Sequence, residues 1–222
     1  MPEIVLKNVT KTFGSVCAVD DLDLVIPDGS FFTLLGPSGC GKTTTLRMIA
    51  GLEKPTGGVI TIGGKTVFDS SSWTIVPPGK RNVGLVFQSY ALWPHMTVEQ
   101  NILFGLKIRK VGQSEQIRRL DEIKELLQIQ GLESRYPNEL SGGMQKRVGI
   151  ARAIALNPKY LFCDEPNSGL DPQTAVLIDR LIYEITKEYN ITTIINTHDM
   201  NSVMEIGDCV GFIFKGNLIW EG

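Results

Sequence analysis

A glycine-rich segment early in the chain has the residue types and spacing of a phosphate-binding loop. Gly36–Thr43 reads GPSGCGKT and fits the pattern G-x-x-x-x-G-K-[ST]. Its glycines (Gly36, Gly39 and Gly41) let successive backbone N–H groups turn inward onto phosphate oxygens, and a helix that starts here adds partial positive charge. Lys42 supplies a point charge for the β- and γ-phosphates, and the Thr43 hydroxyl is a ligand for Mg²⁺. The pattern predicts binding of a nucleoside triphosphate with Mg²⁺, and a glycine turn without a ligand is the alternative.

Two adjacent acids follow a short apolar run in the second half of the chain. Leu161–Cys163 has the character of a buried strand, and Asp164 and Glu165 come directly after it. Consecutive residues at the end of a strand point to opposite sides, so one carboxylate can bind Mg²⁺ while its neighbour addresses an attacking water. We assign Asp164 to the metal and Glu165 to the water; two solvated acids in a loop are the alternative.

A second pair of glycines stands at the start of another predicted helix. Ser141, Gly142 and Gly143 place a hydroxyl group and exposed N–H groups at that helix terminus, which favours anions. We call the two candidate phosphate-binding segments, Gly36–Thr43 and Ser141–Gly143, the first and the second cradle. One nucleotide needs only one cradle, so a second cradle on the same chain makes sense if it binds the nucleotide of another copy. We therefore expect a homodimer that forms when MgATP binds.

The elements that must position these loops can be predicted from the spacing of apolar residues. Apolar runs predict strands at residues 4–9, 22–26, 31–35, 59–62, 65–68, 83–87, 160–164, 191–195 and 210–214. Helical periodicity and capping signals predict helices at residues 42–50, 97–107, 114–128, 141–156 and 172–189. Alternation of strands and helices predicts an α/β fold with a mainly parallel central sheet and an added antiparallel β subdomain. We expect one domain, 1–222, with a nucleotide-binding core at 1–87 and 157–222 and a helical lobe at about 88–156.

Composition narrows the class of protein. The chain has 222 residues, 42% of them hydrophobic and 21% charged, with a net charge of −2, which is typical of a soluble globular protein and gives no reason to expect nucleic-acid binding. The four scattered cysteines include no CxxC pair, which predicts reduced thiols rather than disulfides or a zinc site. Neither a signal peptide nor an apolar run of about 18 residues is present, so we expect a cytoplasmic chain that does not span a membrane by itself.

These motifs, in this order, resemble the ABC (ATP-binding cassette) ATPase family over the whole chain. Leu140–Met144 is similar to the family's signature motif, which contacts the γ-phosphate across a head-to-tail dimer. The resemblance implies a P-loop NTPase fold and an ATPase that uses ATP and Mg²⁺ as the motor subunit of a membrane transporter. Its expected partners are a second copy and transmembrane permease subunits, at the inner face of the membrane.

The resemblance also assigns roles to further residues. Phe13 matches the aromatic residue that stacks on adenine, although a core aromatic is the alternative. Gln88 matches a glutamine that links Mg²⁺ and the attacking water to the membrane partner, and His198 matches a histidine that senses the γ-phosphate, with a plain loop histidine as the alternative. Ser168–Asp171 matches a loop that crosses the dimer interface. The catalytic set is then Glu165, His198, Gln88 and Lys42, and the nucleotide-binding set includes Pro37, Ser38, Cys40, Thr44 and Asp171.

The two halves of the chain resemble different branches of the family. Residues 76–98 look like sugar importers of the maltose type, whereas residues from about 140 onward are more similar to ATPases of the lipid-asymmetry (Mla) type. We therefore hypothesise a recombined or engineered chimera, joined within 113–140 and truncated after residue 222. Such a chain is expected to bind ATP even where its turnover is low.

Three other functions compete with the transport role. A non-transport ABC ATPase usually carries a long coiled-coil insert or a second cassette, which this sequence lacks. A binding module without turnover is a second alternative, and an ATPase assay separates it from an enzyme. A monomeric P-loop kinase is a third alternative, and it is disfavoured because it gives no role to Leu140–Met144 and Ser168–Asp171. The sequence does not identify the transported substrate or the direction of transport.

Overall fold

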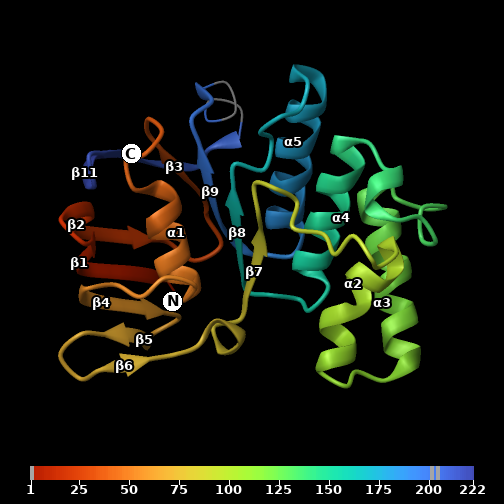
Figure 1. Ribbon diagram of the computed structural model, residues 1–222, viewed down its shortest axis with the longest axis horizontal. Helices are drawn as coiled ribbons and strands as arrows, with labels where there is room; N and C mark the ends of the chain where they lie inside the picture. The colour runs from red at the N-terminus through yellow and green to blue at the C-terminus, as the bar shows by residue number, and fades with distance from the viewer. Residues whose placement is uncertain (1–2, 201–202, 204–205) are drawn as a thin grey trace.

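The structure of the protein is a computed structural model that describes residues 3–200, 203 and 206–222. These residues form two sheets, with helices packed between and beside them (Figure 1). The antiparallel sheet and the helices α2 and α3 lie at opposite ends of the molecule, and the parallel sheet runs between them.

The central sheet has six strands in the order β11-β10-β3-β9-β8-β7. All neighbours from β10 to β7 are parallel, and β11 alone pairs antiparallel, with β10. Every residue of β3, β8 and β9 is buried, as expected for parallel strands that are covered on both faces. This sheet confirms the predicted α/β fold. Its strands are β3 (Phe31–Leu35), β7 (Val83–Val86), β8 (Tyr160–Asp164), β9 (Thr192–Thr197), β10 (Cys209–Phe214) and β11 (Asn217–Glu221).

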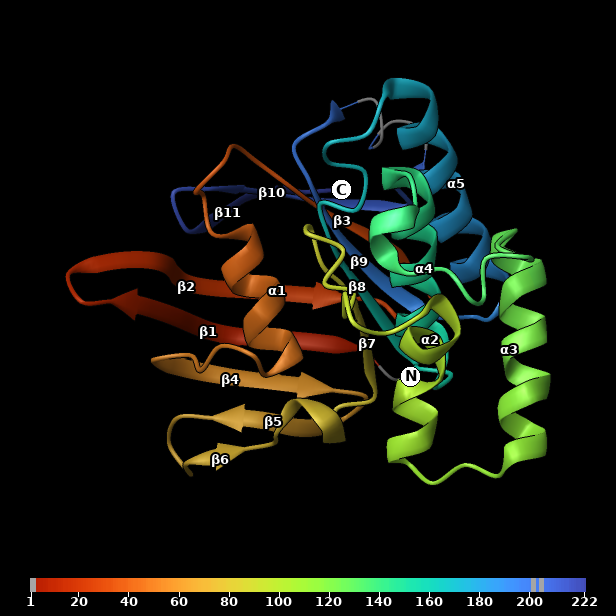
Figure 2. The same ribbon diagram turned by 45° about the vertical axis from the view of Figure 1, so that its right-hand side comes forward.

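The second sheet is antiparallel and has the strand order β2-β1-β4-β5-β6. Its strands are β1 (Ile4–Phe13), β2 (Val16–Ile26), β4 (Gly57–Ile62), β5 (Lys65–Asp69) and β6 (Thr74–Ile75). Buried and exposed residues alternate over most of β2, because one face packs on the core and the other faces solvent. The inner face, α1 (Lys42–Ala50) and one face of the central sheet share a single hydrophobic cluster (Figure 2). The predicted antiparallel β subdomain is therefore present.

Four helices cover the other face of the central sheet. They are α2 (Val98–Ile108), α3 (Gln113–Leu127), α4 (Gly142–Ile154) and α5 (Pro172–Glu188), and short 3₁₀ helices lie at Pro78–Lys80 and Pro137–Glu139. All four contribute to one hydrophobic cluster together with β7 and β8. The described residues from 88 to 159 contain no strand, but α2 and α3 share this core rather than forming one of their own. The proposed subdomain boundaries remain a prediction.

The structure also differs from the expected strands. β1 and β2 are longer than predicted, because they continue as a ribbon in which Phe13 pairs with Val16 beyond the buried part of the sheet. The short strands β6 and β11 were not predicted. β11 has no buried residue and pairs with a single neighbour, and its apolar run, Leu218–Trp220, is shorter than the roughly four to eight residues of a buried strand.

Candidate functional site

The glycine-rich loop joins β3 to α1 at the carboxyl edge of the parallel strands. A side chain at Gly36 would place its Cβ 2.2 Å from the carbonyl oxygen of Ile213, and one at Gly41 would lie 2.5 Å from that of Ala18. Gly41 also has a φ of 112°, in the region that favours glycine, at the N-cap of α1. Both positions therefore require glycine for packing as well as for backbone conformation.

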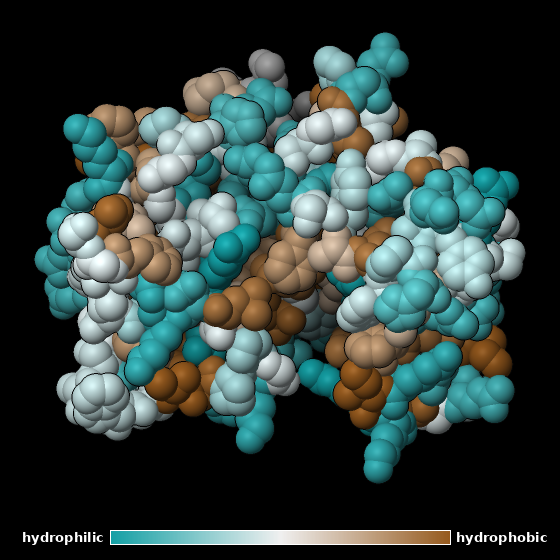
Figure 3. Space-filling model, viewed as in Figure 1, coloured by the Kyte–Doolittle hydropathy of each residue, from teal (hydrophilic) through white to brown (hydrophobic). Residues whose placement is uncertain are grey.

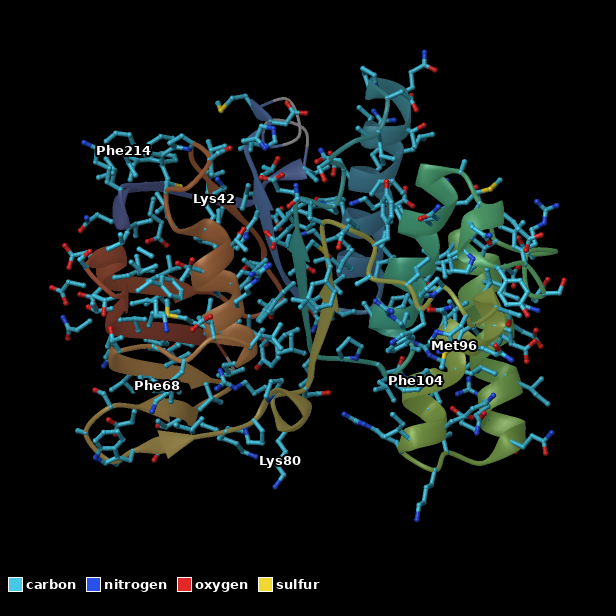
Figure 4. All side chains as sticks on the ribbon, in the orientation of Figure 1. Lys42, Phe68, Lys80, Met96, Phe104 and Phe214 are labelled. Atoms are coloured by element: carbon cyan, nitrogen blue, oxygen red, sulfur yellow. The ribbon has the colours of Figure 1, made fainter. Side chains whose placement is uncertain are left out.

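Lys42 is folded back over the loop that precedes it. Its ammonium group donates to the carbonyl oxygens of Gly36 at 2.6 Å and Pro37 at 3.0 Å, and lies 3.8 Å from Cys40 Sγ. Figure 4 shows Lys42 at the end of α1 nearest this loop, and the residue is only 4% exposed. The loop therefore holds a positive charge at the place where its N–H groups are expected to receive phosphate.

Two of the three residues assigned to Mg²⁺, Thr43 and Asp164, contact each other. Thr43 Oγ1 donates to Asp164 Oδ1 at 2.7 Å, and the same carboxylate oxygen accepts from Asn196 Nδ2 at 3.0 Å. A hydroxyl and a carboxylate are oxygen donors of the kind that Mg²⁺ prefers, with water and phosphate oxygens completing its shell. Among the described residues, no group of three His, Cys, Asp or Glu side chains forms an all-protein metal site. The donor set fits Mg²⁺ that is bound together with a nucleotide.

Three of the predicted catalytic residues meet at Glu165. Its Oε2 accepts from Gln88 Nε2 at 3.1 Å, and its Oε1 lies 3.2 Å from His198 Nδ1. Glu165 has a φ of 47°, a left-handed conformation that is uncommon for a residue other than glycine and that clusters at functional sites. The structure thus brings together residues that are 77 and 33 positions apart in sequence.

A pocket of about 320 Å³ lies between the glycine-rich loop and the pair Gln88 and Glu165, whereas His198 lines a neighbouring pocket of about 530 Å³ together with Ser168 and Leu170. The lining of the smaller pocket comes from β2, the glycine-rich loop with the start of α1, the second residue after β7 and the residue that follows β8: Ala18, Ser38, Gly39, Gly41, Lys42, Thr43, Thr44, Gln88 and Glu165. A larger pocket of about 400 Å³ lies beside Arg118, Arg119 and Glu122, but it contains none of the predicted site residues. We place the candidate site in the smaller pocket because the phosphate-binding and water-binding groups converge there.

The second cradle lies outside this pocket. Ser141 caps α4 by accepting a hydrogen bond from the backbone N–H of Met144 at a long 3.4 Å. Ser141 is exposed, Gly142 and Gly143 are partly exposed, and none of the three lines the first pocket. Within one chain, therefore, the two cradles are not brought together.

Phe13 and Asp171 also lie outside the pocket. Phe13 is 47% exposed at the end of β1, with the ammonium group of Lys11 4.5 Å from its ring centroid. Lys11 is held in turn by an ion pair with Glu53 at 2.6 Å. Asp171 caps α5 by accepting from the N–H of Thr174 at 3.0 Å, and the hydrogen bonds from Thr174 keep the pKa of Asp171 below its ordinary value. The nucleotide-binding roles of both residues stay predictions.

The sequence analysis missed two buried polar residues of the site. Asn196 supports Asp164 from within a strand whose residues are all buried. The ammonium group of Lys146, on α4, donates to the backbone carbonyls of Gln88 at 2.8 Å and Glu165 at 3.4 Å. Burial lowers the pKa of Lys146 to about 8. A signal for Lys146 was available, because helical spacing places it on the same face as Ile150, toward the core.

Comparison with known proteins identifies the family of this chain. The sequence model of the family described as ABC transporter matches residues 19–168. The trehalose/maltose import ATP-binding protein MalK of Thermococcus litoralis is 47% identical over 98% of this chain. The Fe(3+) ions import ATP-binding protein FbpC of Pasteurella multocida is 45% identical over 97% of it. The chain spans 59% and 60% of the length of these two curated relatives.

A solved structure extends the comparison to three dimensions. The dimeric post-hydrolysis state of the ATP-binding cassette MJ0796, bound to ADP and Pi, superimposes with a TM-score of 0.85 at 32% identity. The match covers 99% of this chain and 97% of that one. MalK and FbpC each align over nearly the whole chain, and no comparison confirms a junction within 113–140 or an Mla-like second half. No helix among the described residues is both long and apolar enough to cross a membrane.

Proposed function

The chain belongs to the ABC transporter family, of which it is an ATP-binding domain, and we propose that it hydrolyses MgATP within a head-to-tail dimer of two copies. The observation that carries this proposal is the contact of Glu165 with Gln88 and His198 at one side of a pocket whose other side is the Lys42 loop. That arrangement supports the proposal that the Glu165 carboxylate addresses a water next to a bound γ-phosphate.

Residues in and beside the pocket have distinct parts in the proposed reaction. The N–H groups of Gly36–Thr43 and the ammonium group of Lys42 bind the phosphates. Mg²⁺, when bound, neutralises charge on the β- and γ-phosphates, and Thr43, Asp164 and Gln88 are the residues that would hold it. The Glu165 carboxylate accepts a hydrogen bond from the attacking water and orients it toward phosphorus. Because a carboxylate only accepts, Nδ1 of His198 carries the hydrogen in its contact with Glu165.

The second cradle supports the dimeric part of the proposal. Ser141–Gly143 presents a capped helix start at the surface, away from the pocket of its own chain. An exposed helix terminus of this kind suits a phosphate that arrives from outside the chain. A head-to-tail arrangement gives it one, because the loop of one copy and the helix start of the other then share a nucleotide.

We infer that the dimer works at the inner face of a membrane with permease subunits, in an import system. The curated relatives are named as import proteins for trehalose/maltose and for Fe(3+), and we assign neither substrate to this chain. Figure 3 shows a hollow with apolar residues between the half that carries the antiparallel sheet and the half that carries α2 and α3. Apolar surface of this kind is typical of docking sites. The chimeric origin stays a hypothesis, which separate comparisons of residues 1–110 and 140–222 test.

The experiment that tests the proposed function measures ATP hydrolysis against protein concentration. We expect turnover per molecule to rise over about a hundredfold range of concentration and then to level off, because the active site requires two copies. Light scattering should detect dimers when MgATP is present and monomers when it is absent. The Lys42→Ala variant is the control, and it should neither dimerise nor turn over. A monomer with constant turnover per molecule at all concentrations contradicts the proposal.

A further inference from the structure

Lys146 is a fully buried lysine that none of the sequence motifs explains. It lies on the inward face of α4, is 0% exposed, and is among the largest completely buried side chains of the protein. Removing an ammonium group from water is costly unless polar groups replace the lost hydration. Because burying Lys146 has this cost, we look for a function of its ammonium group that a hydrophobic residue of the same size could not supply.

The groups that receive the Lys146 ammonium are specific. It donates to the backbone carbonyls of Gln88 and Glu165, and it lies 4.7 Å from the ring centroid of Tyr90. Gln88 leaves the sheet just after β7, and Glu165 leaves it just after β8. Since β7 and β8 are parallel neighbours, the two residues emerge side by side at the carboxyl edge of the sheet. One ammonium group therefore bridges the backbones of both.

The side chains of the same two residues meet on the pocket side of this bridge. Gln88 Nε2 donates to Glu165 Oε2, and both side chains line the pocket. Glu165 also holds its left-handed backbone conformation, which needs support from its surroundings. A donor that is fixed behind both carbonyls limits how far either peptide can rotate, and so limits where the two side chains point.

We propose that Lys146 is a positioning residue, which holds Gln88 and Glu165 in the orientation that directs the attacking water. The proposal rests on the proposed function of the pocket and adds a residue to it. Through Lys146, helix α4, which begins at the second cradle, is also connected to the residue that carries the proposed catalytic carboxylate, Glu165 of the same chain. The hydrogen bonds that the structure gives Lys146 go to Gln88 and Glu165 and not to the loop at Gly36–Thr43, so we expect this residue to affect the rate of hydrolysis rather than ATP affinity.

A double-mutant cycle separates this role from a merely structural one. Lys146→Met keeps the length of the side chain but removes its donors, and we expect kcat to fall about tenfold to hundredfold while KM for ATP changes less than about twofold. In the Glu165→Gln background the same change should lower the residual rate much less, by under about threefold, because the carboxylate that addresses the water is already lost and only the positioning of Gln88 remains to be affected. Equal losses in both backgrounds, or an unchanged kcat in the native background, would overturn the proposal.

Two further variants keep the test decisive. Arg147→Met is the matched control: Arg147 is the next basic residue on α4, but it donates to Leu127 and Gln128 at the end of α3, so kcat should stay unchanged. If Lys146→Met does not fold, Lys146→Gln replaces it in the same cycle. Its amide can still donate a hydrogen bond, so we expect kcat to fall less than the tenfold to hundredfold expected for Met but more than about twofold. An equal loss in both backgrounds again overturns the proposal. Absence of ATPase activity in the native protein would instead contradict the proposed function.

Discussion

The two glycine cradles of this protein differ in how complete they are. Gly36–Thr43 is packed closely against neighbouring backbone and already contains a buried ammonium group that holds its carbonyls. At Ser141–Gly143 the cap is a single long hydrogen bond, and the next residue, Met144, is 39% exposed. The first cradle is preorganised by its own chain, whereas the second ends at the surface.

This difference indicates that ATP binding and dimer formation depend on different contacts. A preorganised loop binds phosphate without ordering itself first, so ATP can bind to a single copy. The exposed cradle gains a phosphate partner only when a second copy brings one. Nucleotide binding and dimer formation are therefore separable steps, and substitutions should affect them separately.

The largest expected effect comes from a change that leaves both cradles intact. Glu165→Gln removes the carboxylate that orients the water, and kcat should fall about 10²- to 10⁴-fold, the usual cost of losing a general base. Because ATP then remains uncleaved between the cradles, the dimer should persist in MgATP during size-exclusion chromatography. Phosphate release and the elution volume are the two measurements. Hydrolysis at the native rate would show that Glu165 does not act on the water.

An intermediate effect is expected when one glycine in each cradle is replaced by alanine. Gly41→Ala forces a Cβ to within 2.5 Å of a backbone oxygen at a positive φ, and the strain should weaken ATP binding to the monomer about five- to hundredfold. Gly142→Ala meets only the side chains of Tyr90 and Leu170, at 3.2 and 3.3 Å, so monomer affinity should stay within about twofold.

The second variant should fail at a later step. We expect Gly142→Ala to lower turnover about tenfold or more, because the added methyl group hinders a charged hydrogen bond to the partner's nucleotide. Titration with a fluorescent ATP analogue measures the first property, and ATPase activity against protein concentration measures the second. If both variants lose monomer affinity to the same extent, the distinction between the two cradles is wrong.

The smallest effect on ATP binding is expected for Phe13, the residue that is predicted to stack on adenine. Phe13→Ala should weaken ATP binding about two- to tenfold, which is the range of a single aromatic stacking contact. Val16 pairs with Phe13 across the β1–β2 ribbon and is also exposed, so Val16→Ala is the control and should bind ATP normally. Equal affinities for the Phe13 variant and the native protein would remove Phe13 from the site.

The fold and the individual motifs were predictable because the signals that encode them are local. The glycine loop was predicted from spacing within eight residues, and the helix that starts at Ser141 was predicted from its capping residue. Apolar runs located β3, β8 and β9, because strands that are buried on both faces leave a continuous signal. The exposed strand β11 has only the short apolar run Leu218–Trp220, and it was missed.

The sequence by itself thus determined the phosphate loop, the acidic pair and the α/β class of this protein. The tertiary structure decided which distant residues meet: Gln88 and His198 at Glu165, and Lys146 behind Gln88 and Glu165. The physical reason is that backbone conformation and capping depend on neighbours along the chain. Contacts among β7, β8 and α4 depend instead on strand order and core packing, and no short stretch of residues contains that information.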